Sequence, residues 1–221
     1  MNLEKALHFL IDLNFNNNRK WFKENEERYQ DARISFEQVI EMLIPKLRQI
    51  DKDIEEMAAK TCIFRIFRDV RFSPNKEPYK TNFGALIAKG GRKSPYAGYY
   101  VHFEPDSSFI GGGAYMPQPI ILKSIRKEIY ENTEKYKKII NDKKFKSYFP
   151  EVWGEQLKLA PGGFPKDFKD IDLLKNKHYV VTHNVDNSFW LDKKLIDDII
   201  AVFHTQYEFN KFLNNAISKT Q

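Results

Sequence analysis

The sequence predicts an α+β fold in a single domain over residues 1–221, with one antiparallel sheet of about four to five strands and N- and C-terminal helices packed against it. Three observations predict this class. Helical periodicity occupies the first and last parts of the sequence, and alternating strand patterns cluster between them. The turns between these strand patterns are short, which favours antiparallel neighbours over crossover connections. No internal repeat or Ser/Gly-rich linker marks a domain boundary.

Helical patterns open the sequence. Leu3, Leu7 and Leu10 recur at the spacing of one helix face, and this pattern ends near Asn14. A longer helical pattern runs over residues 21–50, after three consecutive asparagines of the type that caps helix N-termini. Pro45 has no backbone N–H to continue the hydrogen-bond ladder, so we expect a kink or a restart there.

Strand patterns follow in the middle of the sequence. Residues 62–67 alternate like a strand that is buried on both faces, which places Arg65 and Arg68 on opposite sides. Residues 83–89 predict a second strand, and residues 99–104 a third with the clearest alternation. On this third strand we expect one buried side, formed by Tyr99, Val101 and Phe103, and one polar side, formed by Tyr100, His102 and Glu104.

The remaining elements complete the fold. A fourth strand starts at residues 108–110 and leads into glycines 111–113, which we interpret as a tight turn or bulge before a helix near Pro117. A short helix is predicted over residues 134–145, and residues 154–165 have the composition of a loop. Residues 178–182 predict a fifth strand, because Val180 and Val181 are β-branched. Ser188 is predicted to cap a C-terminal helix through residue 203, followed by a last turn or a separate helix at residues 209–213.

Composition excludes several classes of protein. No apolar run approaches the roughly 18 residues needed to cross a bilayer, and no secretion signal opens the sequence. The single cysteine, Cys62, rules out an internal disulfide framework and a cysteine-rich zinc site. Cys62 lies in an apolar run, so we expect it in the core. We therefore expect a soluble, cytoplasmic protein with no membrane partner.

The net charge of +6 is concentrated in one segment. Residues 60–93 hold nine basic and two acidic side chains, so this segment alone carries +7. A local excess of this kind attracts anions, whether small phosphates, nucleic acid or the acidic face of a protein. A solvated basic surface that keeps the protein soluble is the plain alternative.

The arginines of this segment are the strongest candidates for a binding site. Guanidinium groups bind phosphate or carboxylate through two parallel hydrogen bonds and stay charged at any biological pH. Arginines in an apolar, strand-like stretch need partners, so two interpretations stay open: a salt-bridge network with Asp69 and Glu104, or an anion-binding site. The candidate ligand-binding residues are Arg65, Arg68, Arg71, Tyr79, Lys80, Tyr100 and Gly112.

Several blocks of the sequence resemble one known family. They are NNNRKWF at residues 16–22, IFRIFRDVRFS at 63–73, PYKT at 78–81, GYYVHFEP at 98–105, SFIGGG at 108–113 and FLN at 212–214. These blocks resemble the signature of the family called domain of unknown function 2461, and the resemblance spans roughly residues 5–217. The long arginine-rich block is specific. The resemblance implies a conserved hypothetical protein and carries over no activity, substrate or catalytic residue.

Three functions fit these observations. The leading hypothesis is a basic pocket for a phosphorylated or other anionic small molecule, lined by the arginines, Lys80 and the polar side of residues 100–104. The second is a nucleic-acid-binding module, which requires a flat, exposed basic surface. The third is a hydrolase-type enzyme in which Glu104 orients the imidazole of His102 for acid–base catalysis.

Cofactors and metals are not expected. The glycine run has neither the spacing of a dinucleotide fingerprint nor the terminal Lys-Ser/Thr of a P-loop. The histidines show no helical pair of ligands at metal-binding spacing; they are His8, His102, His178, His183 and His204. No pattern indicates a particular oligomeric state.

Overall fold

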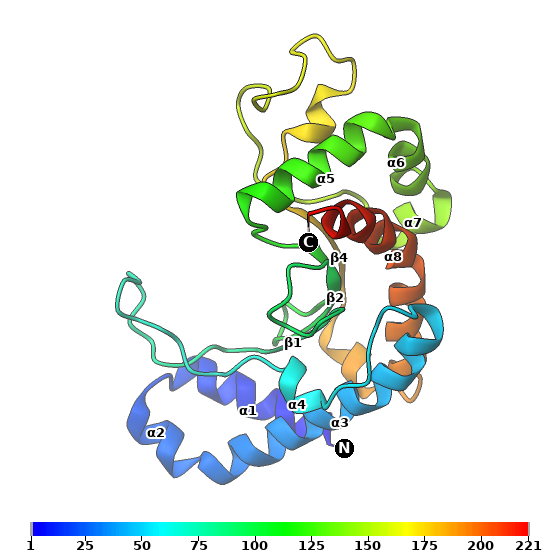
Figure 1. Cartoon of the computed structure of the whole chain (residues 1–221). Coiled ribbons are helices and arrows are strands. Elements are labelled where there is room, and N and C mark those ends of the chain that lie inside the picture. The colour runs from blue at the N-terminus through cyan, green and yellow to red at the C-terminus, as the bar shows by residue number, and fades with distance from the viewer. Residues whose placement is uncertain (1, 221) are drawn as a thin grey trace.

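The structure is a computed structural model that describes residues 2–220, and it has the predicted α+β class. Four antiparallel strands form one sheet in the order β1-β2-β3-β4. They are β1 (Phe83–Ile87), β2 (Gly98–Phe103), β3 (Phe109–Ala114) and β4 (Tyr179–Asn184). Helices α3 (Glu26–Ile50) and α8 (Leu195–Ser218) lie on one side of this sheet, as Figure 1 shows. The predicted sheet and its flanking helices are thus confirmed.

The N-terminal helices follow the sequence prediction with one difference. Helix α1 (Leu3–Phe15) ends where expected, and the Asn18 side chain caps α2 (Arg19–Glu24) by accepting a hydrogen bond from the Trp21 N–H. The predicted long helix is divided at Asn25, and α3 then continues through Pro45 without a restart. The break lies at Asn25 because its side chain donates back to the Trp21 carbonyl oxygen, which competes with helical pairing.

Residues 62–67 do not form the strand that the sequence predicts. Cys62 ends the short helix α4 (Ala59–Cys62) and is fully buried, as expected for a core cysteine. Beyond it, single bridges pair Ile63 with Ala85 and Phe67 with Tyr79, and no continuous ladder forms. Residues 68–77, which we call the arm, then extend away from the rest of the chain (Figure 1).

The base of the arm is tied to the N-terminal helices. Asn17 donates to the carbonyl oxygen of Tyr79 at 3.0 Å and accepts from its N–H at 3.1 Å. The Tyr79 ring stacks on Phe22 with 3.9 Å between ring centroids. The asparagine-rich turn before α2 therefore holds the chain directly ahead of Lys80.

The alternation predicted for β2 is confirmed. Tyr99, Val101 and Phe103 have no exposed surface and pack toward α3 and α8, and such side chains each contribute about 1.5–3 kcal/mol through burial. The opposite face of the sheet carries Tyr100, His102 and Phe109, and Figure 1 shows no helix of the described chain packed over it. We call this side of the sheet the open face.

The glycine run is part of a strand, which corrects the predicted turn. Gly111, Gly112 and Gly113 belong to β3, between β2 and β4. Gly112 has φ +141°, and a Cβ there would lie 2.1 Å from the carbonyl oxygen of Gly98. The strand needs glycine at this position because neither that backbone angle nor that contact tolerates a side chain.

The C-terminal half of the chain supplies the remaining helices. It contains α5 (Pro119–Glu131), α6 (Thr133–Ile140), α7 (Lys143–Tyr148) and two 3-10 turns, η1 (Ile171–Leu174) and η2 (Asn187–Leu191), before α8. Residues 154–165 are a loop, as predicted. Ser188 lies inside η2 and does not cap α8, because Asp186 caps this turn first and α8 begins seven residues beyond Ser188. A single helix includes Phe209–Leu213, so no separate last helix forms.

Buried amide side chains of helix α8 form hydrogen bonds with the start of β2. Gln206 and Asn210 both donate to the carbonyl oxygen of Gly98 at 3.1 Å. Asn214 accepts from the Ala97 N–H and donates to the Ala97 carbonyl oxygen. These bonds satisfy backbone groups where β2 begins, and they fix the strand that carries the open face.

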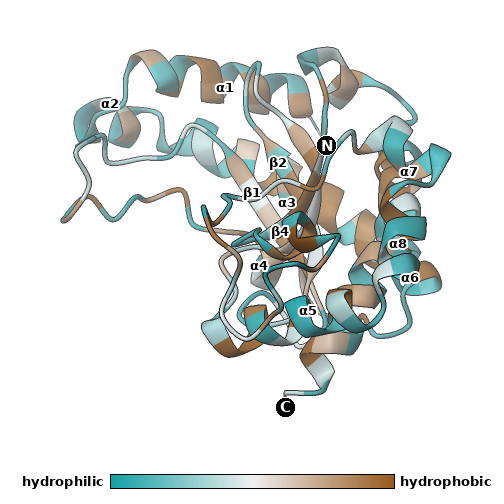
Figure 2. Ribbon diagram, turned by 90° about the horizontal axis from the view of Figure 1, so that it is seen from above, coloured by the Kyte–Doolittle hydropathy of each residue, from teal (hydrophilic) through white to brown (hydrophobic). Residues whose placement is uncertain are grey.

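Hydropathy follows this arrangement. Figure 2 shows hydrophobic residues concentrated where helices and strands meet, and hydrophilic residues along outer turns and loops. Within residues 2–220, no helix is both long and apolar enough to cross a membrane.

Candidate functional site

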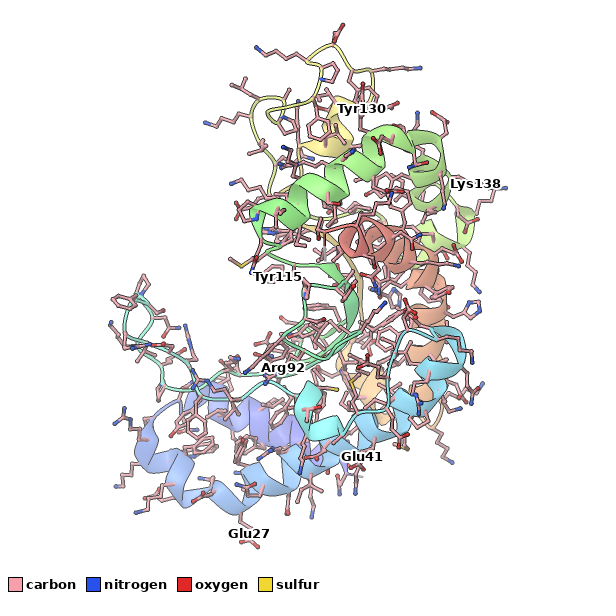
Figure 3. All side chains as sticks on the ribbon, in the orientation of Figure 1. Glu27, Glu41, Arg92, Tyr115, Tyr130 and Lys138 are labelled. Atoms are coloured by element: carbon pink, nitrogen blue, oxygen red, sulfur yellow. The ribbon has the colours of Figure 1, made fainter. Side chains whose placement is uncertain are left out.

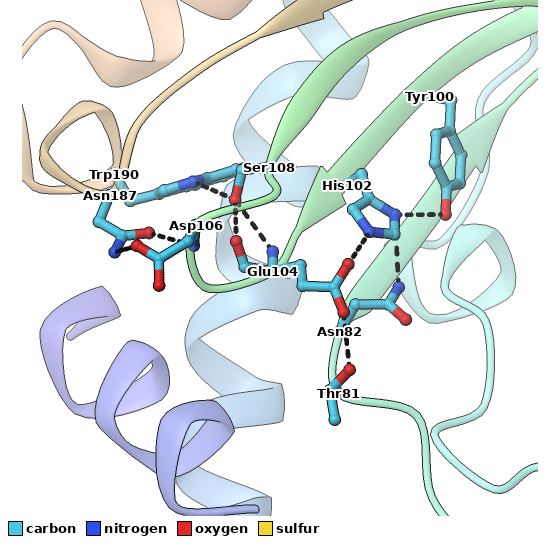
Figure 4. Close-up of polar contacts among 9 residues, drawn as sticks. All are labelled: Thr81, Asn82, Tyr100, His102, Glu104, Asp106, Ser108, Asn187 and Trp190. Carbon is cyan, nitrogen blue, oxygen red and sulfur yellow. Dashed lines mark hydrogen bonds and ion pairs between the residues drawn. The ribbon is translucent and has the colours of Figure 1, made fainter. Parts of the chain in front are cut away.

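The centre of the open face is a chain of hydrogen bonds through His102. The imidazole Nε2 lies 2.9 Å from Glu104 Oε2, and Thr81 donates its hydroxyl to Glu104 Oε1 at 2.6 Å. On the other side of the ring, Nδ1 lies 3.1 Å from the Tyr100 hydroxyl and 3.4 Å from the Asn82 amide nitrogen. Figure 4 shows these contacts from Thr81 through Glu104 and His102 to Tyr100. We call the four residues Thr81, Glu104, His102 and Tyr100 the relay.

The donors and acceptors of the relay can be assigned. Glu104 accepts hydrogen bonds, so His102 donates from Nε2, and Nδ1 then accepts from Tyr100 and Asn82. The Phe109 ring stacks on the imidazole with 4.5 Å between centroids, which holds the ring in this plane. The side chains of His102 and Glu104 are 15% and 27% exposed, so the relay is shielded but reachable from solvent.

The surroundings shift the pKa values of both acidic ends of the relay. Burial raises the pKa of Tyr100 to about 12, and the negative charge of Glu104 and the nearby Tyr115 act in the same direction. Burial alone would also raise the pKa of Glu104, but the hydrogen bonds from His102 and Thr81 outweigh it and lower that pKa. At neutral pH, Tyr100 is therefore a protonated donor, and Glu104 is a carboxylate.

Four cations gather beside the relay. Lys80 Nζ lies 5.6 Å from the centroid of the Phe64 ring, and the guanidinium carbon of Arg92 lies 4.8 Å from the same centroid. The Phe64 ring also meets Tyr100 edge-on at 6.2 Å. Arg65 and Arg68 are close enough to Lys80 to act on its charge. We call Arg65, Arg68, Lys80 and Arg92 the basic cluster; Figure 3 shows Arg92 and Tyr115 along the helix-free side of the sheet.

The positive charge of this cluster is poorly compensated. Arg68 is 3.5 Å from Glu77, and within residues 2–220 no carboxylate lies within ion-pair distance of Arg65, Lys80 or Arg92. The buried Nε of Arg92 has no hydrogen-bond partner among the described residues. Burial lowers the pKa of Lys80, and the guanidinium groups of Arg65, Arg92 and Arg68 lower it further. An anion would relieve both the repulsion and the unpaired donor.

Some of the candidates predicted from the sequence belong to this site and others lie elsewhere. Lys80 and Tyr100 come together beside Phe64 at the open face. Arg65 and Arg68 both act on the charge of Lys80, and they do not lie on opposite faces of a strand. Arg71 is instead 75% exposed on the arm, where Asp69 binds its guanidinium through two hydrogen bonds.

Two further candidates have structural surroundings. Tyr79 is 6% exposed in the aromatic cluster at the base of the arm. The space beside Gly112 is filled by the Gly98 carbonyl oxygen and by Gln206 of α8. The suggested pairing of Glu104 with an arginine is replaced by its bonds to His102 and Thr81.

Arg92 is the site residue that sequence reasoning missed. In the sequence, Arg92 was only counted among the basic residues of segment 60–93, because it follows the Gly90-Gly91 turn and lies outside every predicted strand. After this turn the chain folds back, so that Arg92 contacts Phe64. The periodicity of the sequence does not predict a contact of this kind.

Comparison with protein families gives a match over most of the chain. The family described as conserved hypothetical protein (DUF2461) matches residues 5–212. The chain belongs to this family. No curated protein and no solved structure matches the DUF2461 chain.

Other parts of the DUF2461 chain offer less chemistry. A hollow of about 610 Å³ lies between α3 and α8, away from the relay. It is lined by Lys46, Gln49, Ile50, Ile200, His204, Tyr207 and Glu208. Across residues 2–220, no cluster of three His, Cys, Asp or Glu side chains could hold a metal ion.

Proposed function

We propose that the open face binds a phosphorylated small molecule, with Lys80 and Arg92 as the main contacts. The observation that carries this proposal is the basic cluster, in which three of four cations lack a carboxylate partner within the described residues. Lysine and arginine donors bind phosphoryl oxygens through charge-assisted hydrogen bonds. Arg65 and Arg68 add long-range attraction, and Tyr100 offers a neutral donor beside them.

The location of the site supports a small ligand. Two cations of the basic cluster, Lys80 and Arg92, lie against one aromatic ring, Phe64, at the edge of a half-buried relay. A flat nucleic-acid surface would present its cations along an extended exposed face. We also infer a cytoplasmic location, because a single cysteine allows no internal disulfide framework of the kind that exported proteins commonly carry.

Binding of simple phosphates tests this proposal directly. The probes are inorganic phosphate, pyrophosphate, a sugar phosphate and a nucleoside monophosphate, each measured by calorimetry and thermal shift against chloride at equal ionic strength. We expect Lys80→Gln and Arg92→Gln each to weaken binding at least tenfold, since a hydrogen bond to a charged group contributes about 1.5–3 kcal/mol. The matched control is Arg71→Gln, which removes an arginine already paired with Asp69.

The outcomes separate the alternatives. Tight binding that is lost in Lys80→Gln and Arg92→Gln, but kept in Arg71→Gln, supports a discrete phosphate site. Equal losses in all three variants would indicate diffuse electrostatics and refute the site. Binding of a short oligonucleotide, with an affinity that falls steeply with salt and exceeds that of every mononucleotide, would favour the nucleic-acid module instead.

A further inference from the structure

The relay ends on a hydroxyl group beside the proposed phosphate site. Glu104 holds His102 through Nε2, and His102 Nδ1 contacts the Tyr100 hydroxyl at 3.1 Å. A carboxylate, an imidazole and a hydroxyl in this sequence of contacts are the parts that enzymes use to move a proton to or from a substrate. The binding proposal uses the basic cluster and leaves this chain of contacts without a role.

The structure makes Tyr100 a proton donor. Its raised pKa keeps the phenol protonated at neutral pH, and its oxygen contacts an imidazole that can return a proton after donation. Gly84 provides the room for this arrangement, because a Cβ at that position would lie 2.4 Å from the Tyr100 hydroxyl oxygen. The hydroxyl therefore lies across the glycine of β1, at the centre of the open face.

The donor and the cations share one aromatic neighbour. Phe64 meets the Tyr100 ring edge-on and lies beside both Lys80 Nζ and the Arg92 guanidinium. A phosphoryl group held by the two cations would thus be next to the donor. Lys80 and Arg92 would also stabilise the charge of the phosphoryl oxygens as a bond to phosphorus breaks.

We propose that the open face hydrolyses phosphate monoesters, with Tyr100 as the catalytic acid and with His102 and Glu104 as positioning residues. The proposal rests on the phosphate site described above. A water oxygen forms the new bond to phosphorus while the bond from phosphorus to the ester oxygen breaks. Tyr100 gives its proton to the departing oxygen, which leaves as an alcohol. The attacking water releases a proton, which the neutral His102 accepts at Nδ1 and passes to the Tyr100 phenolate. The imidazolium exists only during this transfer, when Glu104 pairs with it, so His102 and Tyr100 both return to their starting protonation states.

The dependence on the leaving group tests this role. Phosphate release is measured with phenyl phosphate, whose leaving group needs a proton, and with p-nitrophenyl phosphate, whose leaving group is stable as an anion. We expect Tyr100→Phe to slow phenyl phosphate hydrolysis by about 10²- to 10⁴-fold and p-nitrophenyl phosphate hydrolysis by less than tenfold. The matched control is Tyr130→Phe on α5, a partly exposed tyrosine whose ring packs on Phe164 and Phe168.

The positioning residues are tested by a pH profile. Glu104→Gln removes a negative charge that helps to raise the pKa of Tyr100, so the alkaline limb of the rate, where the acid loses its proton, should move to lower pH. A residue with a purely structural role would lower the rate without moving that limb. Far-ultraviolet circular dichroism and phosphate calorimetry on each variant confirm that the fold and the anion site are intact.

The results distinguish the two proposals. Wild-type protein that binds phosphate but releases none from either ester would overturn the catalytic inference and leave the binding proposal in place. Equal losses with both esters in Tyr100→Phe would remove Tyr100 as the acid. Failure to bind any phosphate would overturn both.

Discussion

Replacing Asn17 by alanine should weaken the attachment of the arm and the stability of the protein together. The Asn17 amide makes two hydrogen bonds to the backbone of Tyr79, at 3.0 and 3.1 Å. Tyr79 is 6% exposed, so its N–H and carbonyl group would lose these partners with limited access to water. An unsatisfied buried backbone group costs about 1–3 kcal/mol, and partial hydration on the Asn17 side reduces the sum for the two groups to about 2 kcal/mol.

Urea unfolding measures this change. For a protein of this size, about 2 kcal/mol corresponds to a fall in Tm of about 4–8 °C, with an unchanged dependence on urea. Phosphate affinity should fall as well, because Lys80 directly follows Tyr79 in the chain.

The neighbouring Asn16 provides a matched control. Its side chain donates only to the exposed Asp12 carbonyl oxygen, so Asn16→Ala should stay within about 0.5 kcal/mol of the wild type. If Asn17→Ala is as stable as Asn16→Ala, the two bonds to Tyr79 do not hold the arm, and this reasoning is wrong.

Three further predictions concern the sheet, the core and the cluster. Gly112→Ala should prevent folding, because Gly112 has φ +141° and a Cβ there would lie 2.1 Å from the Gly98 carbonyl oxygen. The expected readout is the loss of soluble expression. Gly162→Ala is the control and should be neutral, because the space around Gly162 is open. Tyr99→Phe should lower the free energy of unfolding, measured in urea, by about 1.5–3 kcal/mol, because it removes the buried 2.8 Å hydrogen bond to the Asp51 carboxylate. A decrease of less than about 0.5 kcal/mol would contradict this. Phosphate affinity should be highest at pH values below the pKa of Lys80, which lies below its ordinary value of 10.5. The affinity should fall as the pH rises through that pKa, because a bound anion favours the charged amine. Lys80→Arg should flatten that fall in calorimetry, and an identical pH dependence in both proteins would exclude Lys80 as a contact.

The sequence predicted those features of the fold that follow from the spacing of neighbouring residues. The alternation along Tyr99–Phe103 correctly separated the buried side of β2 from the open face, because side chains of a strand alternate by geometry. The same rule failed at residues 62–67, where the chain has strand-like composition but pairs at only two isolated points. Pairing depends on distant partners, and a pattern of single residues does not contain them.

The candidate site was predicted in part for the same reason. The charge excess of residues 60–93 pointed to Arg65, Arg68 and Lys80, and alternation placed Tyr100, His102 and Glu104 together. The glycines of β3 suggested a turn, because glycine serves both turns and strands that need close backbone approach. The contacts of Asn17 with Tyr79, and of Arg92 with Phe64, join segments brought together only by the fold.

The buried hydrogen bonds from the amide side chains of α8 to the start of β2 have a consequence for the order of folding during synthesis. Gln206, Asn210 and Asn214 bond to residues 97 and 98, which leave the ribosome more than 100 residues earlier. Strand β2, which carries Tyr100 and His102, therefore cannot hydrogen-bond its first backbone groups or cover its apolar side until α8 has been synthesised. Nascent chains lacking α8 should expose this sheet to chaperones, and the open face should assemble only after α8 has been made.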